Sequence, residues 1–316
     1  MTAPATIQIA TRGSALALAQ ANQILARCQV EFSDENFALN IIKTTGDKLQ
    51  TASLASAELP KGLFTKEIEE ALLDGSGDLA VHSLKDLPTE LPAGLKLGAV
   101  TKRADVRDVL VYRRREFPEG LMLRGLPHGA VLATSSTRRA AQAREVRPDL
   151  QVVPIRGNVG TRLRKVAEQP ELHATMLAAA GLARLGFRIS EDGTLSGEGV
   201  AEGLAATALA VEEMLPCVGQ AAIGIEIRAN DPRLEAMCVR LNHRDTEICV
   251  RAERAFLRAM GGGCHLAVAA YAEHSGDALR LRGVSYLGQS PRRGDLSGSW
   301  DQPEGLGAEL AAALLA

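Results

Sequence analysis

Short runs of apolar residues alternate with longer amphipathic stretches through most of the chain. The first run is residues 7–10, and a Thr-Arg-Gly turn separates it from an amphipathic stretch over residues 14–28. The run is typical of a buried strand, and Ser14 suits a helix N-cap because its hydroxyl can accept a hydrogen bond from an unpaired amide. Repetition of this order predicts an α/β fold, built from βαβ units around a largely parallel sheet.

The same order of strand, polar turn and helix recurs further along the chain. Strands are predicted at residues 39–43, 78–81, 131–133 and 151–155, and helices at 65–73, from 137 onward and after 162. Each polar turn should lie beyond the carboxyl end of its strand, where open α/β sheets bind their ligands. Helix N-termini at that edge attract anions.

After about residue 240 the pattern changes. A long amphipathic helix is predicted over residues 245–260, and it runs into Gly261-Gly262-Gly263-Cys264. Two alternating strands, 267–272 and 279–284, and a terminal helix follow, which predicts a small α+β domain. Two polar segments stand apart from this scheme: residues 44–59, a candidate mobile loop, and residues 190–203, a surface insertion with no assigned role.

Composition narrows the choice of partners. The chain has 36 basic and 38 acidic residues, a net charge of −2, and only 3% aromatic residues. Balanced charge and scarce aromatic residues argue against an arginine-rich nucleic-acid binder. No apolar run approaches the roughly 20 residues that span a bilayer, and the N-terminus lacks a signal-peptide pattern. We therefore expect a cytoplasmic protein with neither a nucleic-acid nor a membrane partner.

Arginine greatly outnumbers lysine, since 28 of the 36 basic residues are arginine. A GC-rich genome could explain much of that excess. However, basic and hydroxyl groups gather in four turns: Arg12 with Ser14, Lys85 beside Asp86, residues 134–139, and Arg156 with Arg162. A single surface arginine contributes little, but four such turns facing one cleft would bind a ligand with several carboxylates or phosphates. No Walker or dinucleotide motif is present, so nucleotides are not favoured.

Two further residues are candidates for chemistry. Asp86 is an acid among cationic turns; it could simply cap a helix or pair with Lys85, or it could stabilise a developing cation and move a proton. Cys264 is the one cysteine of five that follows three glycines, so its loop needs unusual backbone freedom, and it is a candidate for covalent attachment. The cysteines and histidines show no metal-binding spacing, and His82 is interpreted as structural.

The motifs resemble those of the porphobilinogen deaminase (hydroxymethylbilane synthase) family. VHSLKD at residues 81–86 and RGNVGTR at 156–162 are the most specific. In family order, the other matching stretches include ATRGSALALAQ (10–20), KGLFTKEIEEALL (61–73), RADVRDVLV (103–111), ATSSTRRAAQ (133–142), VGQAAIGIE (218–226), LNHRDT (241–246) and GGC (262–264).

This resemblance implies a monomeric transferase of tetrapyrrole biosynthesis that joins four porphobilinogen molecules head to tail into hydroxymethylbilane and releases ammonia. It implies a dipyrromethane cofactor attached to Cys264 by a thioether, and Asp86 as the catalytic carboxylate. The cofactor would be bound through its pyrrole nitrogens by Asp86, and through its carboxylates by Ser83, Lys85, Thr134, Ser136, Arg138 and Arg139. Substrate would be held by Arg12, Ser14, Arg156, Arg162 and Arg184.

The resemblance also implies two lobes of the type II periplasmic-binding-protein kind and a third, cofactor-bearing domain. The expected domains are residues 1–106 with 222–240, residues 107–215, and residues 241–316, with a hinge at 216–221. The chain departs from the family pattern at Leu59-Pro60, Ala221, Gly261 and His173, and the first two bear on loop and hinge motion. The rival interpretation is a two-lobe binding protein for a polycarboxylate or other anion that performs no catalysis.

Overall fold

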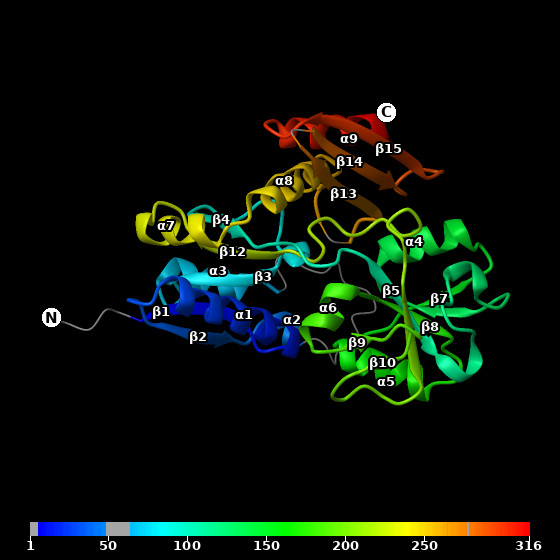
Figure 1. Cartoon of the computed structure of the whole chain (residues 1–316). Helices are drawn as coiled ribbons and strands as arrows, with labels where there is room; N and C mark the ends of the chain where they lie inside the picture. Colours follow the sequence, from blue (N-terminus) through cyan, green and yellow to red (C-terminus); the bar gives the residue numbers. More distant parts are fainter. Residues whose placement is uncertain (1–5, 49–63, 264, 277) are drawn as a thin grey trace.

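The structure is a computed structural model that describes residues 6–48, 64–263, 265–276 and 278–316. Two five-stranded sheets form two lobes, and a third, three-stranded sheet carries two helices. Figure 1 shows the third part lying over the junction between the two lobes. The predicted α/β class with an additional α+β part is confirmed.

The sheet of the first lobe has the strand order β2-β1-β3-β12-β4. Four strands run in one direction, and β12 is antiparallel to both of its neighbours. The strands are β1 (Ile7–Arg12), β2 (Phe37–Ile42), β3 (Leu79–Ser83), β4 (Leu95–Val100) and β12 (Ile223–Arg228).

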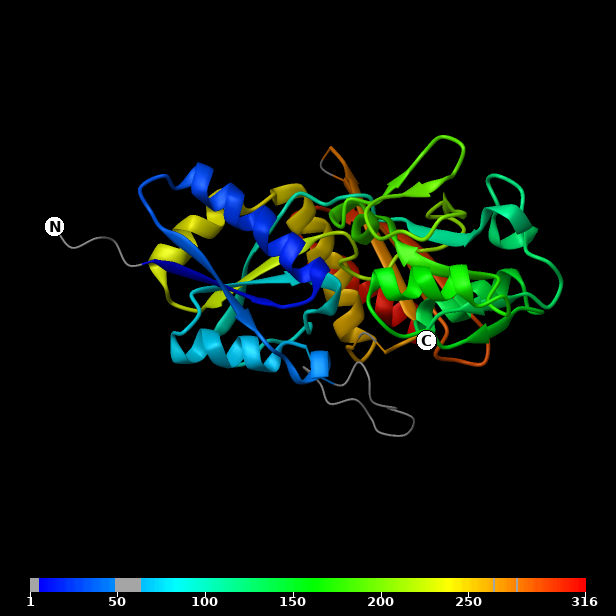
Figure 2. The same ribbon diagram turned by 90° about the horizontal axis from the view of Figure 1, so that it is seen from below.

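Helices cover both faces of this sheet because successive strand residues point to opposite sides. Ile9 packs with α1 (Ala15–Glu31) and α7 (Pro232–Leu241), whereas Ala10 packs with α3 (Lys66–Asp74). Figure 2 shows α1 and α3 on opposite sides of the sheet. Short helical turns α2 (Thr45–Lys48) and η2 (Leu84–Asp86) complete the lobe.

The second lobe repeats the strand order of the first, as β7-β6-β8-β5-β11. Here β5 is the antiparallel strand. Its strands are β5 (Asp108–Arg113), β6 (Val131–Ala133), β7 (Gln151–Val153), β8 (Ala174–Ala178) and β11 (Leu204–Ala208). Its helices are α4 (Thr137–Val146), α5 (Val159–Glu168) and α6 (Ala179–Arg184), with the turns η3 (Arg114–Glu116) and η4 (Leu123–Gly125). The chain crosses to the second lobe through residues 101–107 and back to the first through residues 209–222, and these are the two crossing segments. The strand that follows each crossing, β5 or β12, is the antiparallel strand of its sheet. Both lobes are therefore of the type II periplasmic-binding-protein kind, as predicted.

The third part is a β13-β14-β15 antiparallel sheet packed against two helices. These elements are α8 (Arg244–Ala259), β13 (Val268–Ser275), β14 (Ala278–Ser285), β15 (Arg292–Ser299) and α9 (Pro303–Leu315). Leu310 of α9 and Phe256 of α8 are fully buried between the helices and the sheet. The sequence pattern did not predict β15, whose residues show no apolar alternation.

One local prediction needs correction. The helix expected after Arg162 begins earlier, at Val159, because the Asn158 side chain accepts a hydrogen bond from the amide of Thr161 and so forms the N-cap.

The segment 190–203 is partly regular: β9 (Arg188–Ile189) pairs with β10 (Leu195–Ser196). Of the loop predicted at 44–59, residues 49–59 lie outside the described residues. Among the described helices, none is both long and apolar enough to cross a bilayer.

Gly307 allows α9 to lie directly on α8, and we expect Gly307→Ala to destabilise the protein. An added Cβ would lie 2.3 Å from the Ala252 carbonyl oxygen and 2.8 Å from the Phe256 amide nitrogen. Overpacking of this kind costs about 1–3 kcal/mol. Gly305→Ala on the same helix is the control, because nothing lies within 4 Å of its Cβ position. That change should stabilise by about 0.5–1 kcal/mol. Urea unfolding measures both, and equal effects would refute this packing argument.

Candidate active site

The turns after β1 and β3 lie side by side because these two strands are parallel neighbours. Arg12, Ser14, Ser83 and Asp86 therefore line one small hollow of about 60 Å³, together with Phe64. The Arg12 guanidinium carbon lies 4.3 Å from the centre of the Phe64 ring. The structure thus brings together two of the four turns that the sequence singled out.

Asp86 ends the single turn of η2, where buried Leu84 anchors the backbone and the carboxylate remains exposed. The neighbouring Lys85 turns toward the second lobe. Burial lowers the pKa of Lys85, the charges of Asp86 and Asp108 oppose that shift, and the charge of Arg139 adds to it. Lys85 therefore lies close to groups of both lobes, so the turn with Lys85 and Asp86 faces the turn at residues 134–139.

Arg138 and Arg139 occupy the first turn of α4 and are almost fully buried, with 4% and 6% of their surface exposed. Both bind Asp108: Nη1 of Arg138 lies 2.7 Å from Oδ2, and Nη2 of Arg139 lies 2.6 Å from Oδ1. Arg138 also donates to the carbonyl of Leu215, and Arg139 donates to the carbonyl of Met176. Sequence reasoning assigned these arginines to a ligand and missed Asp108, which orients both guanidinium groups.

The charges in this cluster do not cancel. Burial raises the pKa of Asp108, but the adjacent charges of Arg138 and Arg139 outweigh burial and hold it well below its usual value. With Asp86, which lies beside Lys85, the cluster holds two negative charges and three positive ones, those of Lys85, Arg138 and Arg139. An anionic ligand that approaches this cluster gains a favourable interaction.

The hydroxyl groups predicted to bind ligands also form hydrogen bonds within the protein. Ser14 and Ser136 accept amide hydrogen bonds from Ala17 and Arg139 and cap α1 and α4. The Thr134 hydroxyl accepts the Ser136 amide at 3.2 Å, and the Ser83 hydroxyl donates to Gln20 at 3.0 Å. Since Ser14, Ser136 and Thr134 act here as acceptors, each of these hydroxyls can still donate its proton to a ligand.

The remaining predicted arginines differ in position. Arg162 is half-buried, and burial together with the charge of Arg139 lowers its pKa, while Asp86 opposes the shift across the lobes. Arg156 is exposed at the start of the same motif. Arg184 donates a 2.6 Å hydrogen bond to the carbonyl of Ala221, and burial lowers its pKa to about 10. Arg184 therefore contacts the crossing segment in this structure.

The loop that carries Cys264 reaches both lobes. Cys264 itself lies outside the described residues. Gly261, Gly262 and Gly263 have φ values of 106°, 66° and 101°, a conformation that favours glycine at each position. A Cβ on Gly262 would meet the Thr89 hydroxyl at 3.4 Å, and the carbonyl of His265 accepts a 2.8 Å bond from Thr137 at the start of α4. Its flanking residues therefore bring this loop beside Arg138.

A buried polar network, which sequence reasoning missed, joins the three parts. Glu253 of α8 is fully buried, and its Oε1 lies 2.6 Å from Nη1 of Arg103. The same carboxylate accepts the amides of Gly219 and Ala272. Gln220 continues the network, since its carbonyl accepts from Arg103 and its side-chain amide donates to Asp108 at 3.0 Å. No motif signalled this network, because its members lie far apart in the sequence.

His82 and three of the cysteines occupy buried positions, where they serve the packing of the fold. His82 is buried and lies 3.0 Å from Glu226, which agrees with its structural interpretation. Cys28, Cys238 and Cys249 are buried, and burial raises the pKa of the Cys28 thiol to about 11. Within the described ranges, no group of three or more His, Cys, Asp or Glu side chains could hold a metal ion.

Together, the fold and site define a two-lobed protein in which an exposed carboxylate, Asp86, lies among basic side chains from both lobes. The family model described as "Porphobilinogen deaminase, dipyromethane cofactor binding domain" matches residues 7–236, and "Porphobilinogen deaminase, C-terminal domain" matches residues 247–316. The chain belongs to the porphobilinogen deaminase family. The cofactor is dipyrromethane, and the enzymatic interpretation holds over the non-catalytic one.

Curated relatives agree with this assignment. The porphobilinogen deaminase of Syntrophus aciditrophicus is 46% identical over 312 residues, which cover 98% of this chain and 95% of the relative. That of Pelobacter propionicus is 45% identical over 316 residues, with 99% and 94% covered. Among solved structures, the periplasmic VFT2 domain of Bordetella pertussis BvgS has a TM-score of 0.44 and 13% identity, covering 79% of this chain and 92% of that one.

Asp108→Asn should destabilise the protein by about 3–5 kcal/mol at neutral pH, because it leaves two buried guanidinium groups without a counter-charge. Asp108 has a depressed pKa in the folded state, so its stabilisation is complete above its ordinary pKa and is lost as pH falls. Urea unfolding should show the difference between wild type and variant shrinking below about pH 4. Asp105→Asn, an exposed control, should change stability by less than about 1 kcal/mol. A difference that is independent of pH would contradict this role.

Proposed function

We propose that this chain is hydroxymethylbilane synthase (EC 2.5.1.61), which joins four porphobilinogen molecules head to tail into hydroxymethylbilane and releases ammonia. One observation carries the proposal: exposed Asp86 lies in a hollow with Arg12, within electrostatic reach of Lys85 and of Arg162 from the opposite lobe. Family membership supports the same reaction.

The residues present fit a dipyrromethane. Each pyrrole ring of this group carries an acetate and a propionate, and the cluster of Lys85, Arg138, Arg139 and Asp108 has an excess of positive charge. We assign the cofactor carboxylates to the side chains of Ser83, Lys85, Thr134, Ser136, Arg138 and Arg139. Cys264 would hold the group by a thioether, and its neighbours Gly262 and His265 lie beside Thr89 and Thr137. When bound, the cofactor supplies the pyrrole position to which substrate is added.

Arg12, Ser14, Arg156, Arg162 and Arg184 are assigned to the substrate carboxylates. A guanidinium group binds a carboxylate through two parallel hydrogen bonds, which fixes the orientation of the ring as well as its position. Arg162 interacts electrostatically with Asp86. A substrate carboxylate held by Arg162 would therefore bring the pyrrole nitrogen toward Asp86.

Asp86 acts on the substrate's charge and proton. Loss of ammonia from porphobilinogen leaves a positive charge that is shared with the pyrrole nitrogen. A carboxylate beside that N–H stabilises the cation, and it can accept a proton when aromaticity is restored. Leu84 is fully buried and fixes the turn, so this carboxylate is oriented before substrate arrives.

We further propose the domain division 1–106 with 222–240, 107–215, and 241–316, with residues 216–221 as the hinge, and a monomer that acts in the cytoplasm. The pairing of β12 with β3 and β4 supports the return of the chain to the first lobe. Residues 216–221 lie between β11 and β12, where the chain crosses back to the first lobe, which supports a hinge at this segment.

Cys264→Ser should abolish covalent attachment of the cofactor. The intact mass of the purified wild type should exceed the mass calculated from the sequence by one dipyrromethane, and the variant should show only the sequence mass. Cys249→Ser is the control, since that thiol is buried, and it should retain the extra mass. Retention of the extra mass by Cys264→Ser would exclude this attachment point.

Asp86→Asn should lower turnover by about 100-fold or more while the fold and bound cofactor are retained, because the amide has no charge to stabilise the cation. Single-turnover rates of ammonia release, measured on protein of confirmed cofactor mass, test this. Asp34→Asn, an exposed change in a distant loop, should leave the rate unchanged. Near-normal release by Asp86→Asn would remove this carboxylate from the mechanism.

A further inference from the structure

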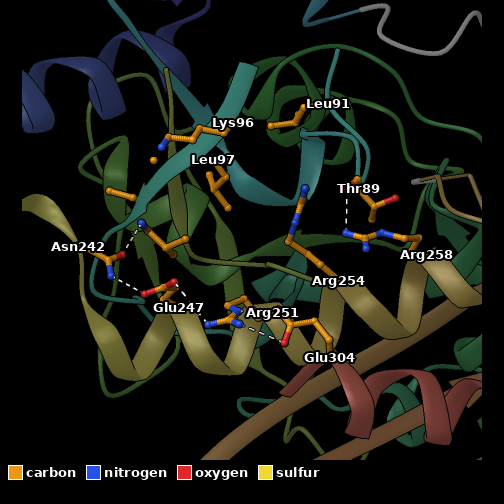
Figure 3. A pocket seen from close by; sticks show the side chains of 13 residues that line it. Thr89, Leu91, Lys96, Leu97, Asn242, Glu247, Arg251, Arg254, Arg258 and Glu304 are labelled. Atoms are coloured by element: carbon orange, nitrogen blue, oxygen red, sulfur yellow. Dashed lines mark hydrogen bonds and ion pairs between the residues drawn. The ribbon is translucent and has the colours of Figure 1, made fainter. Parts of the chain in front are cut away.

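A second pocket of about 390 Å³ lies between the edge strand β4 and α8, outside the proposed active site. Figure 3 shows that Arg254 and Arg258 of α8 extend toward the segment that contains Thr89 and Leu91. None of its lining residues is assigned above to cofactor or substrate. Its volume suits a small organic molecule.

The carboxylates that line this pocket already have partners. Glu304 receives two hydrogen bonds from Arg251, at 2.6 and 3.1 Å. Glu247 accepts a 2.6 Å bond from Asn242 and lies 3.9 Å from Arg251. Lys96 at the pocket's other end is paired with Glu235. Together these three carboxylates and two cations carry one net negative charge.

Arg254 and Arg258 hydrogen-bond to backbone carbonyls and not to carboxylates. Arg254 is 8% exposed and donates to the carbonyls of Leu87 and Pro88, at 3.1 and 2.6 Å. Arg258 donates to the carbonyl of Thr89 at 3.3 Å. Across the described part of the chain, neither guanidinium forms a close ion pair with a carboxylate, and the charges of Glu304 and Glu226 act on Arg258 and Arg254 only at longer range. Burial and the charge of Arg258 lower the pKa of Arg254 to about 10. Two adjacent cations, one of them buried, are costly without a counter-ion.

We propose that this pocket binds a small organic anion, whose carboxylate or phosphate group lies against Arg254 and Arg258 and whose apolar part lies against Leu91 and Leu97. Both leucines are half-buried at the edge of the cluster formed by Leu84, Leu87 and Val100, so they supply an apolar wall. The oxyanion would supply the missing counter-charge and accept the remaining guanidinium hydrogens.

Such a ligand would act on the position of Asp86. The carbonyls that Arg254 binds belong to Leu87 and Pro88, the two residues that follow Asp86. Arg254 thereby fixes the catalytic turn to α8, the helix that leads into the glycine run before Cys264. An anion that neutralises this arginine pair stabilises the contact between the two segments.

Calorimetric titration of the cofactor-bearing protein with benzoate and with phenyl phosphate, at constant ionic strength set with sodium chloride, tests the proposal. At least one probe should bind at a single site. Arg258→Gln should weaken that binding about tenfold or more, the effect expected for a lost charged hydrogen bond. The Arg258 side chain is exposed, so the variant should fold. The preferred probe identifies the carboxylate or the phosphate as the natural group.

Two control variants separate this pocket from other cationic surfaces. Arg233→Gln changes an exposed arginine of α7 that is paired with Glu35, and it should leave binding unchanged. Arg156→Gln, in the proposed active site, should also leave probe binding unchanged. Absence of binding to wild type, unaltered affinity in Arg258→Gln, or an equal loss in Arg156→Gln would overturn the proposal. None of these outcomes depends on measured turnover, so the proposed reaction is tested separately.

Discussion

Asp108 and Glu253 are fully buried carboxylates, and the arrangement of the three parts keeps both of them paired. Removing a carboxylate from water costs several kcal/mol, which only close and well-oriented cations and donors can offset. Glu253 on α8 meets this requirement with Arg103 and two amides, and Asp108 meets it with Arg138, Arg139 and Gln220. The Asp108 cluster joins the second lobe to Gln220, and the Glu253 cluster joins the third part to Arg103 and Gly219, on the two segments that cross between the lobes. The Glu253 cluster therefore forms only when the third part is correctly placed on both of these segments.

The repeated strand order explains how the catalytic groups meet. In the first lobe, parallel pairing of β1 with β3 brings Arg12 and Ser14 beside Ser83 and Asp86. In the second lobe, β6 and β7 place the turns that open α4 and α5 at the equivalent edge. The ligand edges of two similar sheets thus face one another, and Lys85 and Arg162 interact with charges across the junction.

Local features were predictable from sequence because neighbouring residues produce them. The N-caps Ser14 and Ser136, the turn before Asp86 and the glycine run before Cys264 all depend on residues close in the chain. The pairing of Arg138 and Arg139 with Asp108 was not predictable, because the partners lie about 30 residues apart and both arginines matched a ligand motif. Likewise, β15 has polar residues at most positions and becomes a strand because β14 offers it an edge.

The second crossing segment contains a residue in an unfavourable conformation. Ala221 has a φ of 71°, and its carbonyl accepts hydrogen bonds from Arg184 and from the Ala104 amide. The left-handed region costs a residue with a Cβ about 1–2 kcal/mol, which glycine would avoid. The strain at Ala221 is comparable to the net stabilisation by one charged hydrogen bond. The contacts from Arg184 and Ala104 thus hold this crossing segment in a backbone conformation whose cost is similar to the contribution of one of them.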